Sequence, residues 1–133
     1  MKNGRDGDDT WTQIPLQAGK WLHITYVHKD KKTTVYVNGK VQKVFENSAI
    51  NFGENSMIVV GNSGYRNDYL REIRLWDKAL TESEINDYLY LPMDPATPHL
   101  ISYLPLSKEM ETKDLKAPAG TENVTTKARI EYV

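Results

Sequence analysis

The chain has 133 residues, no cysteine and a formal net charge of -1. This length fits one domain, and the lack of cysteine excludes a disulfide-stapled mini-domain and any thiolate metal site. The near-neutral balance argues against a nucleic-acid or anionic-membrane partner, and no apolar run is long enough to cross a membrane. The first residues lack the apolar core of a signal peptide, so an exported parent protein would carry its signal outside this chain.

The first part of the chain predicts short strands joined by tight turns. Residues 1–10 are polar and glycine-bearing, and we expect a loop or frayed end there, followed by a short extended segment over 11–16. Residues 21–28 are rich in β-branched and aromatic side chains and predict a strand. Strands over 33–37 and 41–45 follow. They are joined by Asn38-Gly39, a strong two-residue hairpin signal. Three lysines, Lys29, Lys31 and Lys32, are interpreted as a solvated hairpin turn.

The second part predicts further strands and one helix. We expect a loop over 47–55, a strand over 57–61, a polar loop over 62–68 and a strand over 69–77. A helix over 82–90 is predicted because Thr81 and Glu84 have capping-box spacing, with Leu80 and Ile85 placed to form the hydrophobic staple. Three prolines end the helix, and strands are expected over 100–106 and 129–133. These elements predict an all-β, antiparallel two-sheet sandwich with one short helix.

Four motifs occur in one order along the chain. They are Gly19-Lys20-Trp21-Leu22-His23, Val35-Tyr36-Val37-Asn38-Gly39, Ile58-Val59-Val60-Gly61 and the segment from Leu70 to Ile85. Together they resemble the laminin-G-like branch of the concanavalin A-like jelly rolls. A fifth piece, residues 100–106 followed by Lys113-Asp114-Leu115, resembles a stretch that follows such domains in exported polysaccharide-harvesting proteins of Bacteroidetes. The resemblance implies a jelly roll in a bacterial surface or secreted protein.

The chain departs from the family pattern in ways that affect its boundaries. Arg71 stands where the family usually has Asp, and the N-terminal strands of a complete sandwich are missing. We therefore expect the C-terminal portion of a jelly roll, or a smaller sandwich completed by Trp11 and the tail strands. The sandwich core is assigned to 11–91, with 92–133 packed on the same domain. Strand edges left unpaired would favour swapping or a homodimer.

Catalysis is not expected. Some relatives of this fold are glycosidases, which need a pair of closely spaced carboxylates. The family's tight E-x-D-x-x-E cluster does not occur, and Glu82 and Glu84 lie in the first turn of the predicted helix, where acidic groups favour the helix dipole. The three histidines, His23, His28 and His99, are scattered and have no metal-ligand spacing, which argues against both nucleophilic chemistry and zinc.

The leading hypothesis is a non-catalytic carbohydrate-binding module. Sugar binding needs an aromatic ring for the pyranose face and polar groups for the hydroxyls. The loop with Asn62, Tyr65, Arg66, Asn67 and Asp68 offers both, although the same residues also suit an ordinary turn. Trp11 is a second candidate stacking surface or a core residue, and Trp21 and Trp76 are interpreted as core.

Two further hypotheses stay open beside this one. The chain could be a protein-interaction or structural module, or the accessory domain of a glycoside hydrolase. No cofactor is required, but laminin-G-like domains can bind calcium on rim loops, and Asp6, Asp8, Asp9 and Asn67-Asp68 are its candidate ligands. A solvated acidic cluster is the simpler interpretation of those residues.

Overall fold

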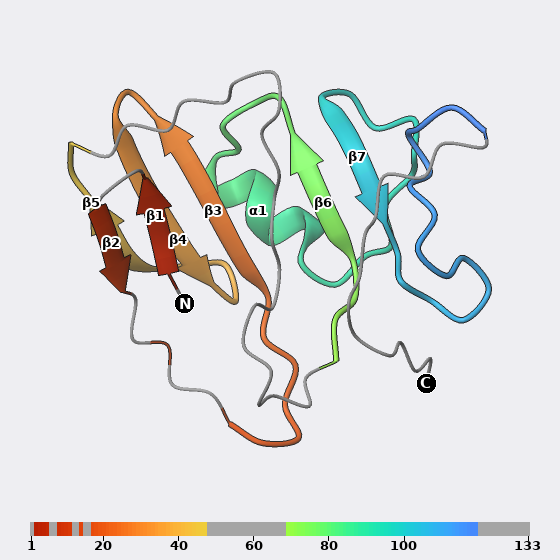
Figure 1. Cartoon of the computed structure of the whole chain (residues 1–133), viewed down its shortest axis with the longest axis horizontal. Coiled ribbons are helices and arrows are strands. Elements are labelled where there is room, and N and C mark those ends of the chain that lie inside the picture. The colour runs from red at the N-terminus through yellow and green to blue at the C-terminus, as the bar shows by residue number, and fades with distance from the viewer. Residues whose placement is uncertain (1, 6–7, 12–13, 15–16, 48–68, 120–133) are drawn as a thin grey trace. The chain divides into compact units, whose positions relative to one another are not determined.

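The computed structural model describes residues 2–5, 8–11, 14, 17–47 and 69–119, and Figure 1 shows its elements. In chain order they are β1 (Lys2–Arg5), β2 (Asp8–Trp11), β3 (Ile24–Lys29), β4 (Lys32–Val37), β5 (Lys40–Phe45), β6 (Ile73–Trp76), α1 (Glu82–Tyr88) and β7 (Leu100–Leu104). All strand pairs are antiparallel, in sheets ordered β1-β2, β3-β4-β5 and β6-β7. The prediction of an antiparallel all-β fold with one short helix is therefore confirmed.

The chain divides into two compact units. The first contains the described residues up to 47 together with Ala79–Tyr90, and so holds β1 to β5 and α1. The second contains the described residues of 69–78 and 91–119, and holds β6 and β7. Each unit is thus built from segments that are distant in sequence.

The N-terminal segment differs from expectation. Residues 1–10 were predicted to be loop, but Lys2–Arg5 and Asp8–Trp11 pair as an antiparallel hairpin with Lys2 opposite Trp11 and Arg5 opposite Asp8. The loop prediction is wrong for these residues, because main-chain hydrogen bonds hold a ladder together without the alternating apolar pattern on which the prediction relied. Trp11 ends β2 instead of beginning an extended segment.

Two tight turns build the three-stranded sheet. Asn38 and Gly39 have φ values of 50° and 76°, as the type I′ turn predicted for this pair requires. Asp30 and Lys31, at 51° and 60°, make a second turn of the same kind between β3 and β4. The side chain of Asn38 also accepts a hydrogen bond from the His23 backbone N–H at 3.0 Å, so this turn is tied to the residue just before β3.

The sheet has a buried face and a more open one. Thr33 and Val35 of β4 are fully buried, and Phe45 of β5 is buried on the same side. Side chains alternate along a strand, so Thr34 and Tyr36 point to the opposite side. Trp21 was expected in the core, but it precedes β3 and is 59% exposed, so that interpretation is wrong. The predicted strand over 21–28 begins only at Ile24.

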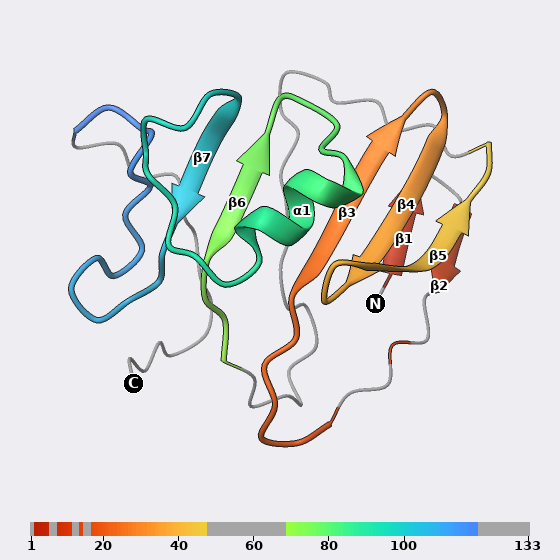
Figure 2. The same cartoon turned by 180° about the vertical axis from the view of Figure 1, so that it is seen from behind.

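The helix forms as its sequence predicts. The Thr81 hydroxyl accepts from the Glu84 N–H at 3.2 Å, and the Glu84 carboxylate accepts from the Thr81 N–H at 2.8 Å, which completes the capping box. Leu80 and Ile85 are both buried, as the two residues of a hydrophobic staple should be. In Figure 2, seen from behind, α1 comes in front of β3. Asn86 on α1 donates to the Gly39 carbonyl at 3.0 Å, which joins the helix to the β4–β5 turn.

The second unit is built on the β6–β7 pair, in which Ile73 lies opposite Leu104 and Arg74 opposite Tyr103. Both strands are shorter than the predicted 69–77 and 100–106. Trp76, interpreted as core, is half-buried at the end of β6.

Asp114 reinforces β7: its carboxylate accepts from the Ser102 hydroxyl at 2.6 Å and from the Tyr103 N–H at 2.9 Å.

Candidate functional site

An open groove lies on the less buried face of the β3–β4 hairpin. It encloses a cavity of about 390 Å³, within the range of small-ligand sites. We call it the sheet groove and define it by its lining residues. These come from the two strands, from the turn between them and from the segment that leads into α1: Val27, Lys29, Asp30, Lys32, Thr34, Tyr36, Ala79, Leu80 and Thr81. All of them belong to the first unit.

Strand register explains why these side chains meet. In the β3–β4 ladder Thr25 lies opposite Tyr36, Val27 opposite Thr34 and Lys29 opposite Lys32. Directly opposed residues of an antiparallel pair project to the same face, and residues two apart on one strand do so as well. The Asp30–Lys31 turn sets this register. The alternation along the hairpin therefore places side chains from alternate positions of both strands in the groove.

The groove has an apolar part and a polar part. Val27, Leu80 and the half-buried ring of Tyr36 supply apolar surface. Thr34 adds a hydroxyl, while the Thr81 hydroxyl already accepts the Glu84 N–H of the helix cap. A planar ring beside hydroxyl groups is the combination that binds a sugar, whose ring has an apolar face and a polar edge.

The turn end of the groove carries positive charge. The Lys32 ammonium forms an ion pair with the Glu46 carboxylate at 3.1 Å, and both side chains are at least half exposed. Lys29, directly opposite Lys32, has no carboxylate within ion-pair distance among the residues that the structure describes. Two ammonium groups thus share this end, with the turn residue Asp30 beside them.

Each of the three histidine rings contacts a side chain of its own unit. The His23 and His28 rings contact the Thr25 and Thr33 hydroxyls of the sheet, at 3.3 Å and 2.9 Å. His99 pairs with Asp77 at 2.8 Å in the second unit, where both side chains are more than half exposed. Across the described ranges, no three His, Cys, Asp or Glu side chains gather as metal ligands would.

Three of the five candidate calcium ligands lie outside the described residues, and the side chains of the other two are not described. Asp6, Asn67 and Asp68 fall outside the described residues. Asp8 and Asp9 belong to β2, but their side chains are not described. A calcium site on these residues therefore stays a prediction from sequence.

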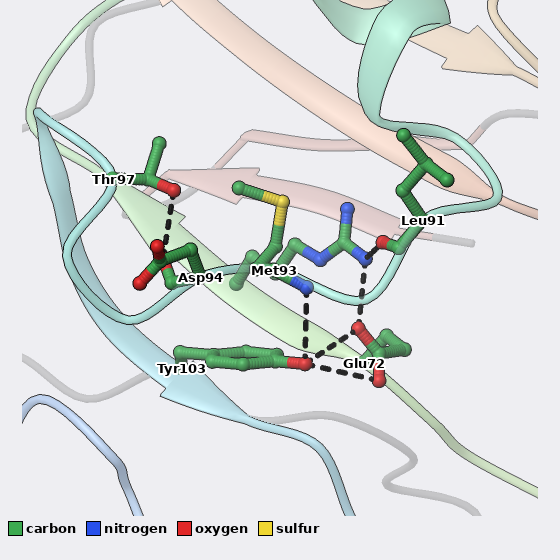
Figure 3. Close-up of polar contacts among 7 residues, drawn as sticks. Glu72, Leu91, Met93, Asp94, Thr97 and Tyr103 are labelled. Carbon is green, nitrogen blue, oxygen red and sulfur yellow. Dashed lines mark hydrogen bonds and ion pairs between the residues drawn. The ribbon is translucent and has the colours of Figure 1, made fainter.

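A partly buried polar network organises the second unit (Figure 3). The Arg74 guanidinium donates through Nη2 to the Glu72 carboxylate and to the Leu91 carbonyl, both at 2.7 Å. The Tyr103 hydroxyl donates to the same carboxylate at 3.0 Å and accepts from the Met93 N–H at 3.3 Å. Burial, and to a smaller extent the hydrogen bond to Glu72, raises the pKa of Tyr103, while the Met93 N–H opposes the shift. The network ties the segment after the helix to β6 and β7, so we assign it a structural role.

The residues predicted from sequence to bind sugar are not tested by these contacts. Five of them, Asn62, Tyr65, Arg66, Asn67 and Asp68, lie outside the described residues. Trp11 ends β2, and its side chain is not described.

Sequence reasoning missed the sheet groove. The sequence alone indicates a solvated turn at Lys29 and Lys32 and places Tyr36 in the hairpin motif without assigning it to a site. The signal was present in the alternation, because a two-residue turn at Asp30–Lys31 places Lys29 opposite Lys32 and Thr25 opposite Tyr36. Interpreting Lys29, Lys31 and Lys32 together as one solvated turn leaves that register undefined.

Comparisons with known proteins agree with this architecture. A proposed carbohydrate-binding protein from Bacteroides ovatus ATCC 8483 has a similar crystal structure, with a TM-score of 0.59 and 25% sequence identity over 75% of this chain and 32% of that one. An S-layer domain-containing protein from Clostridium thermocellum ATCC 27405 is 21% identical over 60% of this chain and 44% of that one, with a TM-score of 0.37, too low to support an argument. No curated protein matches the sequence.

The chain spans about a third of the length of the Bacteroides ovatus protein. The described helix is too short to cross a membrane. The sequence profile of one family, described as the concanavalin A-like lectin/glucanases superfamily, matches residues 1–86. This match covers more than half of the chain and includes the lining residues of the sheet groove, and the chain therefore belongs to the concanavalin A-like lectin/glucanases superfamily.

Proposed function

We propose that the chain is a non-catalytic carbohydrate-binding module and that the sheet groove is its sugar site. The observation that carries the proposal is one groove of about 390 Å³ that combines the Tyr36 ring with the Thr34 hydroxyl and two ammonium groups. The similarity to a proposed carbohydrate-binding protein supports the same function. Fold alone would not, because this superfamily includes both lectins and glucanases.

Binding would use stacking and hydrogen bonds together. The Tyr36 ring offers a flat apolar surface to one face of a pyranose, and Val27 and Leu80 extend that surface. The Thr34 hydroxyl and the Lys29 ammonium can then hydrogen-bond sugar hydroxyls at the ring edge. The loop with Tyr65, together with Trp11, remains a predicted second contributor.

The non-catalytic part of the proposal rests on the carboxylates. Glycoside hydrolysis uses two of them flanking one bond. Among the described residues that line the groove, Asp30 is the single acidic one. The nearby Glu84 carboxylate accepts the Thr81 N–H and is engaged in capping the helix.

The proposal is tested by titrating the chain with soluble oligosaccharides in a calorimeter, before and after Tyr36→Leu. Leucine keeps apolar bulk on the strand but removes the planar ring, so we expect binding to weaken about tenfold or more. Tyr26→Leu is the matched control, since Tyr26 projects from the opposite face of the same hairpin. Binding that survives Tyr36→Leu but fails after Tyr65→Ala would move the site to the predicted loop.

We further propose a surface or secreted location for the parent protein, which the resemblance to exported polysaccharide-harvesting proteins supports. A protein-interaction module is the second candidate, favoured by the exposed Val41 and Val44 on β5, the last strand of its sheet. Size-exclusion chromatography combined with glycan titration distinguishes a sugar-binding module from a protein-interaction module. A stable dimer that resists dilution and shows no glycan binding would support assembly instead.

A further inference from the structure

We propose that the sheet groove selects acidic oligosaccharides, binding a sugar ring at its Tyr36 end and a carboxylate or sulfate group at its lysine end. This inference deepens the proposed function and rests on it. The feature that carries it is the separation of aromatic surface and positive charge along one groove.

The two ends are far enough apart to contact different sugar units. Tyr36 and Lys32 are four residues apart on β4, which corresponds to roughly 13 Å along a strand. One pyranose ring cannot span that length. An oligosaccharide lying along the hairpin would therefore place one ring on Tyr36 and a later unit beside Lys29 and Lys32.

The charges at the lysine end are arranged unfavourably for the free protein. Lys29 and Lys32 are directly opposed across the ladder, and like charges in that relation destabilise a sheet. Glu46 compensates Lys32 at 3.1 Å, while Lys29 has no such carboxylate in the described part of the chain. A ligand anion beside Lys29 would supply the missing counter-charge. The chain as a whole has a net charge of -1, so general attraction of anions does not explain this local arrangement.

Asp30 defines how the anion would have to approach. Its carboxylate is also at the turn end, and it would repel an anion held close to it. The favourable position is therefore on the side of the two ammonium groups that faces away from the turn, toward the Thr34 hydroxyl. Because the ammonium groups are exposed, the selectivity should weaken as salt is raised.

The test compares three ligands of equal length by calorimetry: an oligogalacturonate, its carboxyl-reduced neutral counterpart and a sulfated galactan oligosaccharide. We expect both acidic ligands, or one of them, to bind roughly tenfold more tightly than the neutral one at low salt. Comparing the two acidic ligands identifies carboxylate or sulfate as the preferred anion. Lys29→Gln should abolish the preference, so that the acidic and neutral ligands bind with equal affinity. Lys31→Gln is the matched control, because Lys31 is a turn lysine that does not line the groove.

The outcomes separate this inference from the proposed function. If acidic and neutral ligands bind equally and Tyr36→Leu weakens both, the sugar site stands and the acidic selectivity is overturned. If Lys31→Gln removes the preference as fully as Lys29→Gln does, general charge explains it and the inference is also overturned. If no ligand binds, or if Tyr36→Leu has no effect on any of them, the groove is not the sugar site and both proposals fail.

Discussion

The amide of Asn86 donates to the Gly39 carbonyl at 3.0 Å and joins α1 to the turn between β4 and β5. The turn and the helix approach so closely that a Cβ on Gly39 would overlap the Asn86 side chain and lie 3.0 Å from Leu89 Cδ1. Gly39 also has a φ of +76°, a backbone conformation that residues with a side chain rarely adopt. Both constraints act on one residue of the predicted Asn-Gly hairpin.

We expect Gly39→Ala to destabilise the protein by about 2–3 kcal/mol, because it combines an unfavourable φ with loss of the Asn86 hydrogen bond. Urea unfolding measures the change. Gly19→Ala is the matched control: Gly19 has a φ of +75°, but a Cβ added to it would meet nothing within 4 Å. It should cost about 1 kcal/mol, from backbone conformation alone. Equal effects of the two substitutions would contradict a role for the helix contact.

Lys31 is expected to be replaceable with a gain in stability. It has a φ of 60° in the turn between β3 and β4, where Asp-Gly is a preferred pair. Lys31→Gly should stabilise the fold by about 0.5 kcal/mol. The free energy gained by removing a side chain from a left-handed conformation exceeds the entropic cost of glycine in the unfolded chain. Lys40→Gly, at the start of β5, should lower the urea midpoint instead. A lower midpoint for both variants would argue against the turn geometry.

The ion pair between Arg74 and Glu72 should matter more than an exposed pair. The Arg74 side chain is 7% exposed, so Glu72→Gln would remove a negative charge that lies 2.7 Å from a buried guanidinium. We expect a loss of about 2–4 kcal/mol in the free energy of unfolding. Glu46→Gln, which breaks the exposed pair with Lys32, should cost about 1 kcal/mol or less. Similar losses would show that the Arg74 pair is not buried in solution.

Stability should fall at alkaline pH through Tyr103. Burial holds the pKa of this hydroxyl above its ordinary value of 10.0, so the folded protein retains the proton more tightly than the unfolded chain does. The stabilisation is therefore fully present below pH 10.0 and is lost as the pH rises toward the raised pKa. Tyr103→Phe should give a shallower decline between neutral and alkaline pH in thermal unfolding. Parallel curves for the two proteins would contradict the assignment.

The elements that were predicted correctly are those whose sequence signals lie within a few neighbouring residues. The capping box of Thr81 and Glu84 and the turn at Asn38-Gly39 each depend on neighbouring residues, and both form as expected. Trp21 was placed in the core from its residue type, but burial depends on where the strand begins, and β3 starts after it. The sheet groove depends on the register of two strands, and the interpretation of Lys29 and Lys32 as turn residues does not give that register.

Glu72 is the clearest case that sequence could not predict. Its φ of 58° is unusual for glutamate and shortens the predicted strand, yet it accompanies the contacts with Arg74 and Tyr103. Those partners lie on β6 and β7, so the compensation for the backbone conformation comes from residues up to 31 positions away.

Asp114 has a consequence for self-association. Its carboxylate already accepts the Tyr103 N–H, and the Leu115 N–H donates to the Tyr103 carbonyl at 2.8 Å. A foreign strand approaching β7 here would meet main-chain groups that are already occupied. Asp114 and Leu115 therefore block, at Tyr103, the edge-to-edge strand pairing on which amyloid-like stacking depends.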